Sequence, residues 1–172
     1  MADETMYGDH GFLSIVRGGS EHIRQSDIIV RTLVAGSDTV KAGMALSGDG
    51  MGANTADHAI TTDKAFLGIC LGPVSPADTY DLDDVIADGT LVKILKKTGG
   101  RVKVAVFYEA AAGPIALVEG DKIAIGTEAG KVRKFIYADA TAATDSFDEI
   151  IGTSADVDAG STDTDHVIVI NY

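Results

Sequence analysis

The feature that most constrains the fold is a period-two alternation of apolar and polar residues over short runs. In residues 101–108 the apolar side chains of Val102, Val104 and Val106 occupy every second position. This spacing places them on one face of a β-strand. The chain also contains 20 glycines and only 3 prolines, so turn residues interrupt these runs often. The pattern predicts many short strands joined by tight turns.

Two β-hairpins are expected from glycines that lie between such runs. Gly99 and Gly100 separate the first pair of runs, and Gly130 separates the second. Glycine adopts the positive φ that tight hairpin turns require. The expected pairs are residues 90–97 with 101–108, and residues 121–125 with 131–137.

The rest of the chain fits the same fold class. Further strands are expected at residues 27–34, 39–46, 65–71, 149–151 and 166–170. Helical signals are confined to one short turn after Pro76, no internal repeat is evident, and residues 47–63 are expected to form an exposed loop. The sequence therefore predicts an all-β protein with minor α content, built as a small β-sandwich or barrel of short antiparallel strands.

The first 25 residues are expected to form an extended N-terminal arm. They lack sustained periodicity and have no evident partner strand, and a terminal segment of this kind often orders against another molecule. Residues 26–172 are expected to form a single β-rich domain. The apolar residues of the arm, which are the candidate anchors, are Met6, Tyr7, Phe12, Leu13, Ile15 and Val16.

Charge excludes several classes of partner. The formal net charge of −12 argues against a surface for nucleic acid or for anionic lipid, both of which require clustered cations. Apolar runs are too short for a transmembrane helix, and the acidic N-terminus is unlike a signal peptide. The basic residues gather on the two expected hairpins, at Lys93, Lys96, Lys97, Arg101 and Lys103 and at Lys131, Arg133 and Lys134. They are expected to protect sheet edges or to pair with acidic neighbours in an assembly.

Motifs for catalysis are lacking, so no catalytic residue, cofactor or metal ligand is predicted. The single cysteine, Cys70, lies in an apolar run and is expected to be a small buried hydrophobe. The histidines, His10, His22, His58 and His166, are scattered along the chain. Acidic clusters at residues 81–84 and 156–165 lack the closing glutamate of a helix–loop–helix calcium site. These clusters leave open an alternative function, that of a carbohydrate- or cation-binding β-sandwich module.

Four segments in order resemble the capsid cement, or head decoration, proteins of tailed viruses that infect bacteria or archaea. The segments are Gly-Thr-Leu-Val-Lys-Ile at residues 89–94, a Gly-Asp-Lys-Ile strand with its following turn and strand at 118–132, Ile-Ile-Gly-Thr-Ser-Ala at 150–155, and a closing His-Val-Ile-Val-Ile at 166–170. The resemblance covers residues 27–172. Residues 47–63 and the acidic stretch at 139–148 depart from the family pattern.

The resemblance implies a non-enzymatic structural protein of the virion. Members of this family bind the outside of an assembled icosahedral shell, often as homotrimers, and an N-terminal arm orders on the shell. The expected partners are therefore the major capsid protein and further copies of this chain. The expected location is the outer capsid surface, reached after synthesis in the host cytoplasm.

Overall fold

The computed structural model describes residues 16–17, 23–34, 40–48, 54–60, 65–74, 84–109, 116–136, 150–155, 157 and 166–172. Nearly all the regular structure in these ranges is β, with one short 3-10 turn at Gln25–Asp27. The strands are β1 (Val16–Arg17), β2 (Ile28–Leu33), β3 (Ala45–Gly48), β4 (Thr55–His58), β5 (Phe66–Pro73), β6 (Leu91–Leu95), β7 (Lys103–Phe107), β8 (Lys122–Ile125), β9 (Val132–Lys134), β10 (Ile150–Ser154) and β11 (Val167–Asn171). The predicted all-β fold is confirmed.

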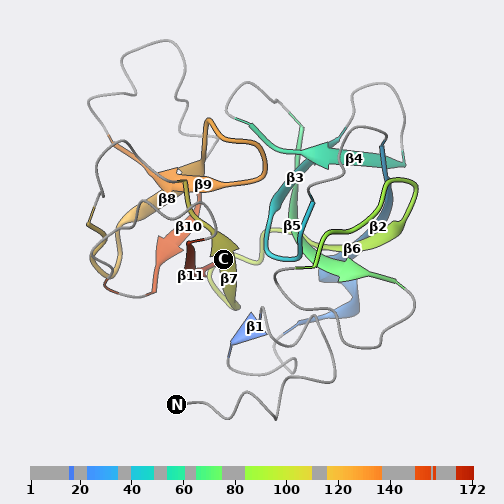
Figure 1. Cartoon of the computed structure of the whole chain (residues 1–172). Coiled ribbons are helices and arrows are strands. Elements are labelled where there is room, and N and C mark those ends of the chain that lie inside the picture. The colour runs from blue at the N-terminus through green and yellow to red at the C-terminus, as the bar shows by residue number, and fades with distance from the viewer. Residues whose placement is uncertain are drawn as a thin grey trace.

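Strands β2 to β6 form a closed barrel, which we call unit 1 (Figure 1). Its strands follow the order β2-β4-β3-β5-β6, and β6 returns to β2. The β2–β4 pair is parallel, and every other pair is antiparallel. Closure pairs both edges of each strand over part of its length, which is how small β proteins avoid exposed sheet edges.

Strands β7 to β11 form unit 2, which lies beside unit 1 in Figure 1. They belong to a six-stranded sheet with the order β1-β7-β11-β10-β8-β9. An isolated parallel bridge between Tyr108, at the end of β7, and Val132 of β9 joins the far edge of this sheet back to β7. Unit 2 is therefore a second five-stranded ring, held closed at one point, with β1 added outside it.

The two units have the same topology, so the chain contains a structural repeat. In chain order, the first strand of each unit pairs in parallel with the third and antiparallel with the fifth, and the second pairs with the third and fourth. The pairings superpose residue by residue: Leu33 lies opposite Ala56 in unit 1, and Tyr108 lies opposite Val132 in unit 2. The prediction of no internal repeat is wrong, because the two units share strand pairing and almost no residue identity.

An irregularity in the fourth strand also recurs. The pairing of β5 with β3 shifts register next to Gly68, and that of β10 with β8 shifts next to Gly152. A Cβ atom at Gly68 would lie 2.0 Å from the carbonyl oxygen of Leu95, and one at Gly152 would lie 2.4 Å from that of Asn171. Glycine is thus required at both positions because the fifth strand approaches too closely for any side chain.

Buried residues form two clusters, and three strands of unit 1 contribute to both. In β5, Cys70 packs inside unit 1, whereas its neighbours Ile69 and Leu71 pack in the cluster shared with unit 2. Ile94 and Leu95 of β6 divide in the same way. A strand that is buried on both faces is apolar throughout, which explains the continuous apolar run around Cys70. The shared cluster packs the two units together.

One predicted hairpin is confirmed and the other is wrong. Strands β8 and β9 pair around Gly130, which has a φ of +72°. Strands β6 and β7 do not pair, because β6 belongs to unit 1 and β7 to unit 2. Gly99 and Gly100 do have positive φ, but the turn carries the chain from one unit to the other.

The expected loop at residues 47–63 also needs correction. Residues 55–58 form β4, which is an integral strand of the closed barrel, and Ala56 is fully buried. Of the strand expected at residues 39–46, only Ala45 and Leu46 belong to β3, and residues 42–43 form a turn before it. The helical turn expected after Pro76 falls largely outside the described residues.

Candidate functional site

The predicted arm is described only near its end. Of the six candidate anchors, Val16 lies in β1, and Met6, Tyr7, Phe12, Leu13 and Ile15 lie outside the described residues. Their role therefore stays a prediction.

The described part of the arm lies against its own chain. Val16 is opposite Val104, and Arg17 is opposite Lys103, in an antiparallel pair at the edge of β7 (Figure 1). For these two residues, the expectation that the arm has no partner strand in its own chain is wrong. The arm thus enters the folded body as an edge strand, a mode in which main-chain hydrogen bonds supply the attachment.

The folded body begins before the expected boundary at residue 25. Ile23 packs against the buried cluster shared by the two units. The 3-10 turn that follows is capped by Asp27, whose Oδ2 accepts a hydrogen bond from the backbone N–H of Arg24 at 2.9 Å. Residues 23–25 are therefore part of the β-rich body, and the arm proper precedes Ile23.

Asp27 also ties this turn to the connection between the units. The guanidinium Nη2 of Arg101 lies 3.1 Å from Asp27 Oδ2. The Arg24 N–H, together with the hydrogen bond and charge of Arg101, holds the pKa of Asp27 below its ordinary value, although partial desolvation opposes the shift. The two partners are 74 residues apart, so no local sequence pattern predicts this ion pair.

The crossover between the units, residues 96–102, and the residues beside it carry exposed basic side chains. Lys96 and Lys97 follow β6, and Lys103 begins β7 opposite Arg17. The Lys97 ammonium donates a hydrogen bond of 2.6 Å to the carbonyl oxygen of Ile150. We call this region, with exposed Arg24, Lys96, Lys97, Arg101 and Lys103, the basic arm-exit end. Four of the five residues of the first predicted basic group therefore lie in or beside the crossover, whereas Lys93 lies within β6.

Tyr172 fixes the crossover from the inside. Its carbonyl oxygen accepts hydrogen bonds from Thr98 Oγ1 and from the N–H of Gly100, the latter at 2.9 Å. The Tyr172 hydroxyl donates to the carbonyl oxygen of Leu95 at 3.1 Å, and burial raises the pKa of that hydroxyl. The edge on which β1 lies is therefore held by a buried aromatic residue that contacts both units.

The second basic group pairs with acids within the chain. Lys134 Nζ lies 2.7 Å from Asp121 Oδ2, and Lys131 Nζ lies 2.6 Å from Glu128 Oε2. The hydrogen bond from Lys134 is the main cause that holds the pKa of Asp121 low. These lysines therefore serve the β8–β9 hairpin itself.

The structure describes little of the predicted acidic and histidine candidates. Within the described ranges, no three His, Cys, Asp or Glu side chains come together as a metal site. Of residues 81–84 and 156–165, only Asp84 and Val157 are described, and His10 and His22 lie outside the described ranges. Cys70 is fully buried, and burial raises its thiol pKa to about 12, so the structural interpretation of this cysteine is confirmed.

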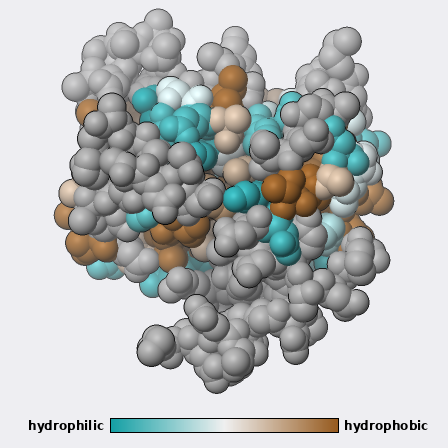
Figure 2. Space-filling view, in the orientation of Figure 1, coloured by the Kyte–Doolittle hydropathy of each residue, from teal (hydrophilic) through white to brown (hydrophobic). Residues whose placement is uncertain are grey.

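The described residues show no single dominant apolar patch on the face drawn in Figure 2, where the brown apolar areas are separate from one another. None of the helices in the part of the chain that the structure describes is long and apolar enough to cross a membrane. The basic arm-exit end differs from these areas, because it combines the edge strand β1 with exposed basic side chains.

Comparisons with known proteins add no assignment. No protein-family model matches the chain, and no curated protein matches its sequence.

Proposed function

We propose that this chain is a structural protein that binds the outer surface of an assembled icosahedral capsid and stabilises it. The observation that supports this best is the order of elements in the stretch that resembles cement proteins. The Gly-Asp-Lys-Ile motif leads into the β8–β9 hairpin, the Ile-Gly motif lies in β10, and β11 follows. The motifs therefore occupy strand and turn positions in the order that the resemblance implies.

The architecture suits attachment through an arm. Two closely packed units with mainly aliphatic interiors form the folded body, and the arm joins this body at the edge of β7. An extended segment gains affinity by adding a strand to an exposed sheet edge and by placing side chains in pockets. In this proposal Met6, Tyr7, Phe12, Leu13, Ile15 and Val16 supply the anchors, and the basic arm-exit end adds electrostatic attraction to acidic groups on the shell.

An assembled shell offers the arm contacts to several neighbouring subunits, which a single subunit does not. Ordering an arm costs conformational entropy, which contacts to several adjacent subunits repay together. Bridging neighbouring major capsid proteins in this way resists their separation. Copies of this chain acting together, as a homotrimer, multiply the contacts further.

Co-sedimentation with shells tests the proposal. If the proposal holds, the genome that encodes this chain also encodes a major capsid protein, and shells assembled from that protein are the probe. The variant is the full-length chain that carries Phe12→Ala and Leu13→Ala together. We expect the variant to bind at least tenfold more weakly, because two large anchors are lost while the described core is untouched.

The matched control is Val157→Ala, since Val157 is 77% exposed and lies far along the chain from the arm. This control is expected to bind like the wild type. Full occupancy by the arm variant would overturn the arm mechanism, and failure of the wild-type chain to bind shells at all would overturn the proposed function.

A further inference from the structure

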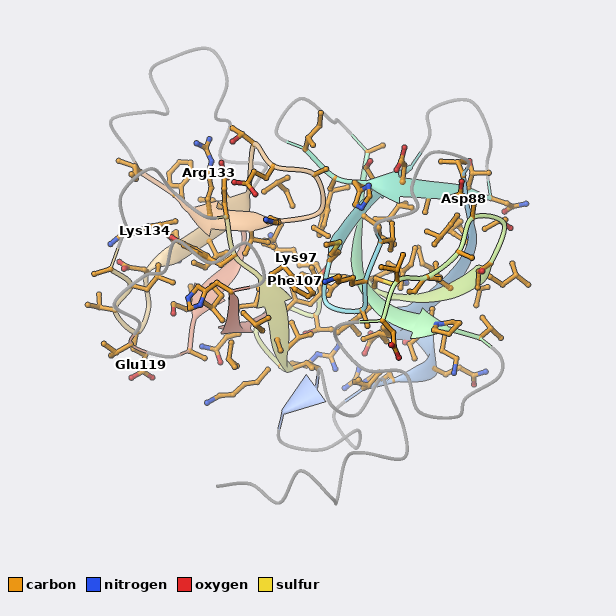
Figure 3. The ribbon with its side chains drawn as sticks, viewed as in Figure 1. Asp88, Lys97, Phe107, Glu119, Arg133 and Lys134 are labelled. Atoms are coloured by element: carbon orange, nitrogen blue, oxygen red, sulfur yellow. The ribbon has the colours of Figure 1, made fainter. Side chains whose placement is uncertain are left out.

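The charge of the chain is divided unevenly between the described residues and the rest. Of the 14 Lys and Arg, 13 lie in the described ranges, but only 8 of the 26 Asp and Glu do. The described residues therefore carry a formal charge of +5, whereas the other residues, with one Lys and 18 acids, carry −17. Figure 3 shows Lys97 between the two units and Lys134 on the outer side of unit 2. The folded body is thus basic, although the whole chain is acidic.

A row of polar side chains crosses the outer face of the unit 2 sheet. Its members lie opposite one another on four neighbouring strands, and they are Lys103 on β7, Asn171 on β11, Thr153 on β10 and Lys122 on β8. Residues that are opposite in this way project from the same face of a sheet. The adjacent row, with Val104, Ile170 and Ser154, is fully buried. The polar residues therefore face outward, and we call them the outer row.

Both ends of the outer row are exposed lysines. Lys103 and Lys122 form no ion pair with any described residue, whereas Lys131 and Lys134 of the β8–β9 hairpin do. Between the two exposed lysines, Asn171 Nδ2 donates a hydrogen bond of 3.5 Å to Thr153 Oγ1. The row spans three strand spacings, so the two lysines leave the sheet about 14 Å apart. It therefore offers two separated positive charges with polar groups between them.

We propose that the outer row of one copy of this chain binds the acidic residues 156–165 of a second copy. This segment contains no Lys or Arg, and its acids are Asp156, Asp158, Asp163 and Asp165. Its charge is therefore complementary to that of the row. Asp158 and Asp163 are five positions apart, so an extended chain separates them by up to about 17 Å, enough to reach both lysines of the row. The inference rests on the charge distribution and the sheet register and not on the proposed capsid function.

The places where the segment and the row meet the sheet favour contact between copies. The segment leads into the start of β11, whereas the row crosses β11 at Asn171, near its end. These two places are about 14 Å apart along the strand. Because the segment and the row are different surfaces, the association is head-to-tail, and it closes into a ring or continues as a chain. Repulsion between chains of net charge −12 is screened beyond about 8 Å at physiological ionic strength, so local charges determine the contact.

Sedimentation velocity of the full chain tests this inference. We expect the weight-average mass to rise with concentration up to about 1 mM, where even a contact with a millimolar Kd is well populated. Association is expected to weaken at least tenfold in about 1 M salt, where the screening length falls to about 3 Å. The row variant carries Lys103→Glu and Lys122→Glu, and the segment variant carries Asp158→Lys and Asp163→Lys. Each is expected to associate at least tenfold more weakly than the wild type, with the urea midpoint as the check that the fold is retained.

The two variants distinguish a specific contact from a general effect of net charge. The row variant is more negative than the wild type and the segment variant is less negative, so unspecific repulsion would change their association in opposite directions. A chain with all four substitutions has the net charge of the wild type and complementary charges in exchanged places. It is therefore expected to regain association. Lys96→Glu, which reverses an exposed lysine outside the row, is the matched control and is expected to associate like the wild type.

Four outcomes would each overturn the proposal. The first is a wild-type chain that remains monomeric at about 1 mM. The second is a row or segment variant that associates as the wild type does. The third is a chain with all four substitutions that stays monomeric, and the fourth is a control that loses as much association as the row variant.

Discussion

Replacement of Gly152 by alanine tests the close approach of strands in unit 2. The new Cβ would lie 2.4 Å from the carbonyl oxygen of Asn171, whereas Cβ contacts below 3.0 Å are essentially never seen. Strands β10 and β11 would have to separate by about 0.6 Å at this point, because the obstacle is backbone and has no rotamer to change. Overpacking of this kind costs about 1–3 kcal/mol, and each ladder hydrogen bond that is weakened adds about 1 kcal/mol. We expect Gly152→Ala to lower the free energy of unfolding by roughly 3 kcal/mol.

Urea denaturation followed by circular dichroism measures this change as a lower midpoint at constant m. Gly89→Ala is the matched control, since Gly89 has a φ of +76° but nothing lies within 4 Å of its Cβ position. It is expected to cost only about 1–2 kcal/mol, from the left-handed backbone alone. A loss of less than about 1 kcal/mol in Gly152→Ala, or an equal loss in the control, would refute the close approach.

Three further outcomes follow from buried or paired side chains. The pKa of Asp121 is held low in the folded state, so its contribution to stability is present above pH 3.8 and is lost as the pH falls through the lowered value. Asp121→Asn is therefore expected to destabilise the protein at pH 7 and to have little effect near pH 2. Urea titration at both pH values measures the difference. Cys70 is expected to resist a thiol reagent at pH 8 in the native protein and to react at once in denaturant. The absorbance of the chromophore that the reagent releases measures this reaction. Fast labelling of the native protein would contradict the burial of Cys70. Tyr172→Phe is expected to cost about 1–2 kcal/mol because the carbonyl oxygen of Leu95 loses its buried donor, and an unchanged urea midpoint would refute that hydrogen bond.

The β content was predictable because the signals for it are local. The alternation in residues 101–108 correctly predicted β7, and the glycine at position 130 correctly predicted the β8–β9 hairpin. Pairing between distant strands was not predictable by the same means. Gly99 and Gly100 have the conformation expected of a hairpin turn, yet β6 and β7 pair with strands of different units. Local turn chemistry does not specify which strands meet.

The repeat and the barrel strand β4 escaped prediction for related reasons. Residues 55–58, Thr-Ala-Asp-His, contain one β-branched residue, Thr55, and no Phe, Tyr or Trp, so they carry a weak strand signal. Closure of the barrel holds them in place. The two units share backbone positions such as Gly43 and Gly120, which only hydrogen-bond partners reveal as equivalent. At the arm-exit end, the clustered lysines were visible in the sequence, but the ion pair of Asp27 with Arg101 depends on the fold.

The most direct test of the proposed function compares binding of the full chain to assembled shells and to unassembled major capsid protein, both at the same subunit concentration. The proposal predicts saturable binding to shells at a fixed number of copies per subunit, and binding at least a hundredfold weaker to free subunits, because the arm needs neighbouring subunits to repay its ordering. Equal binding to both forms, or no binding to shells, would contradict it.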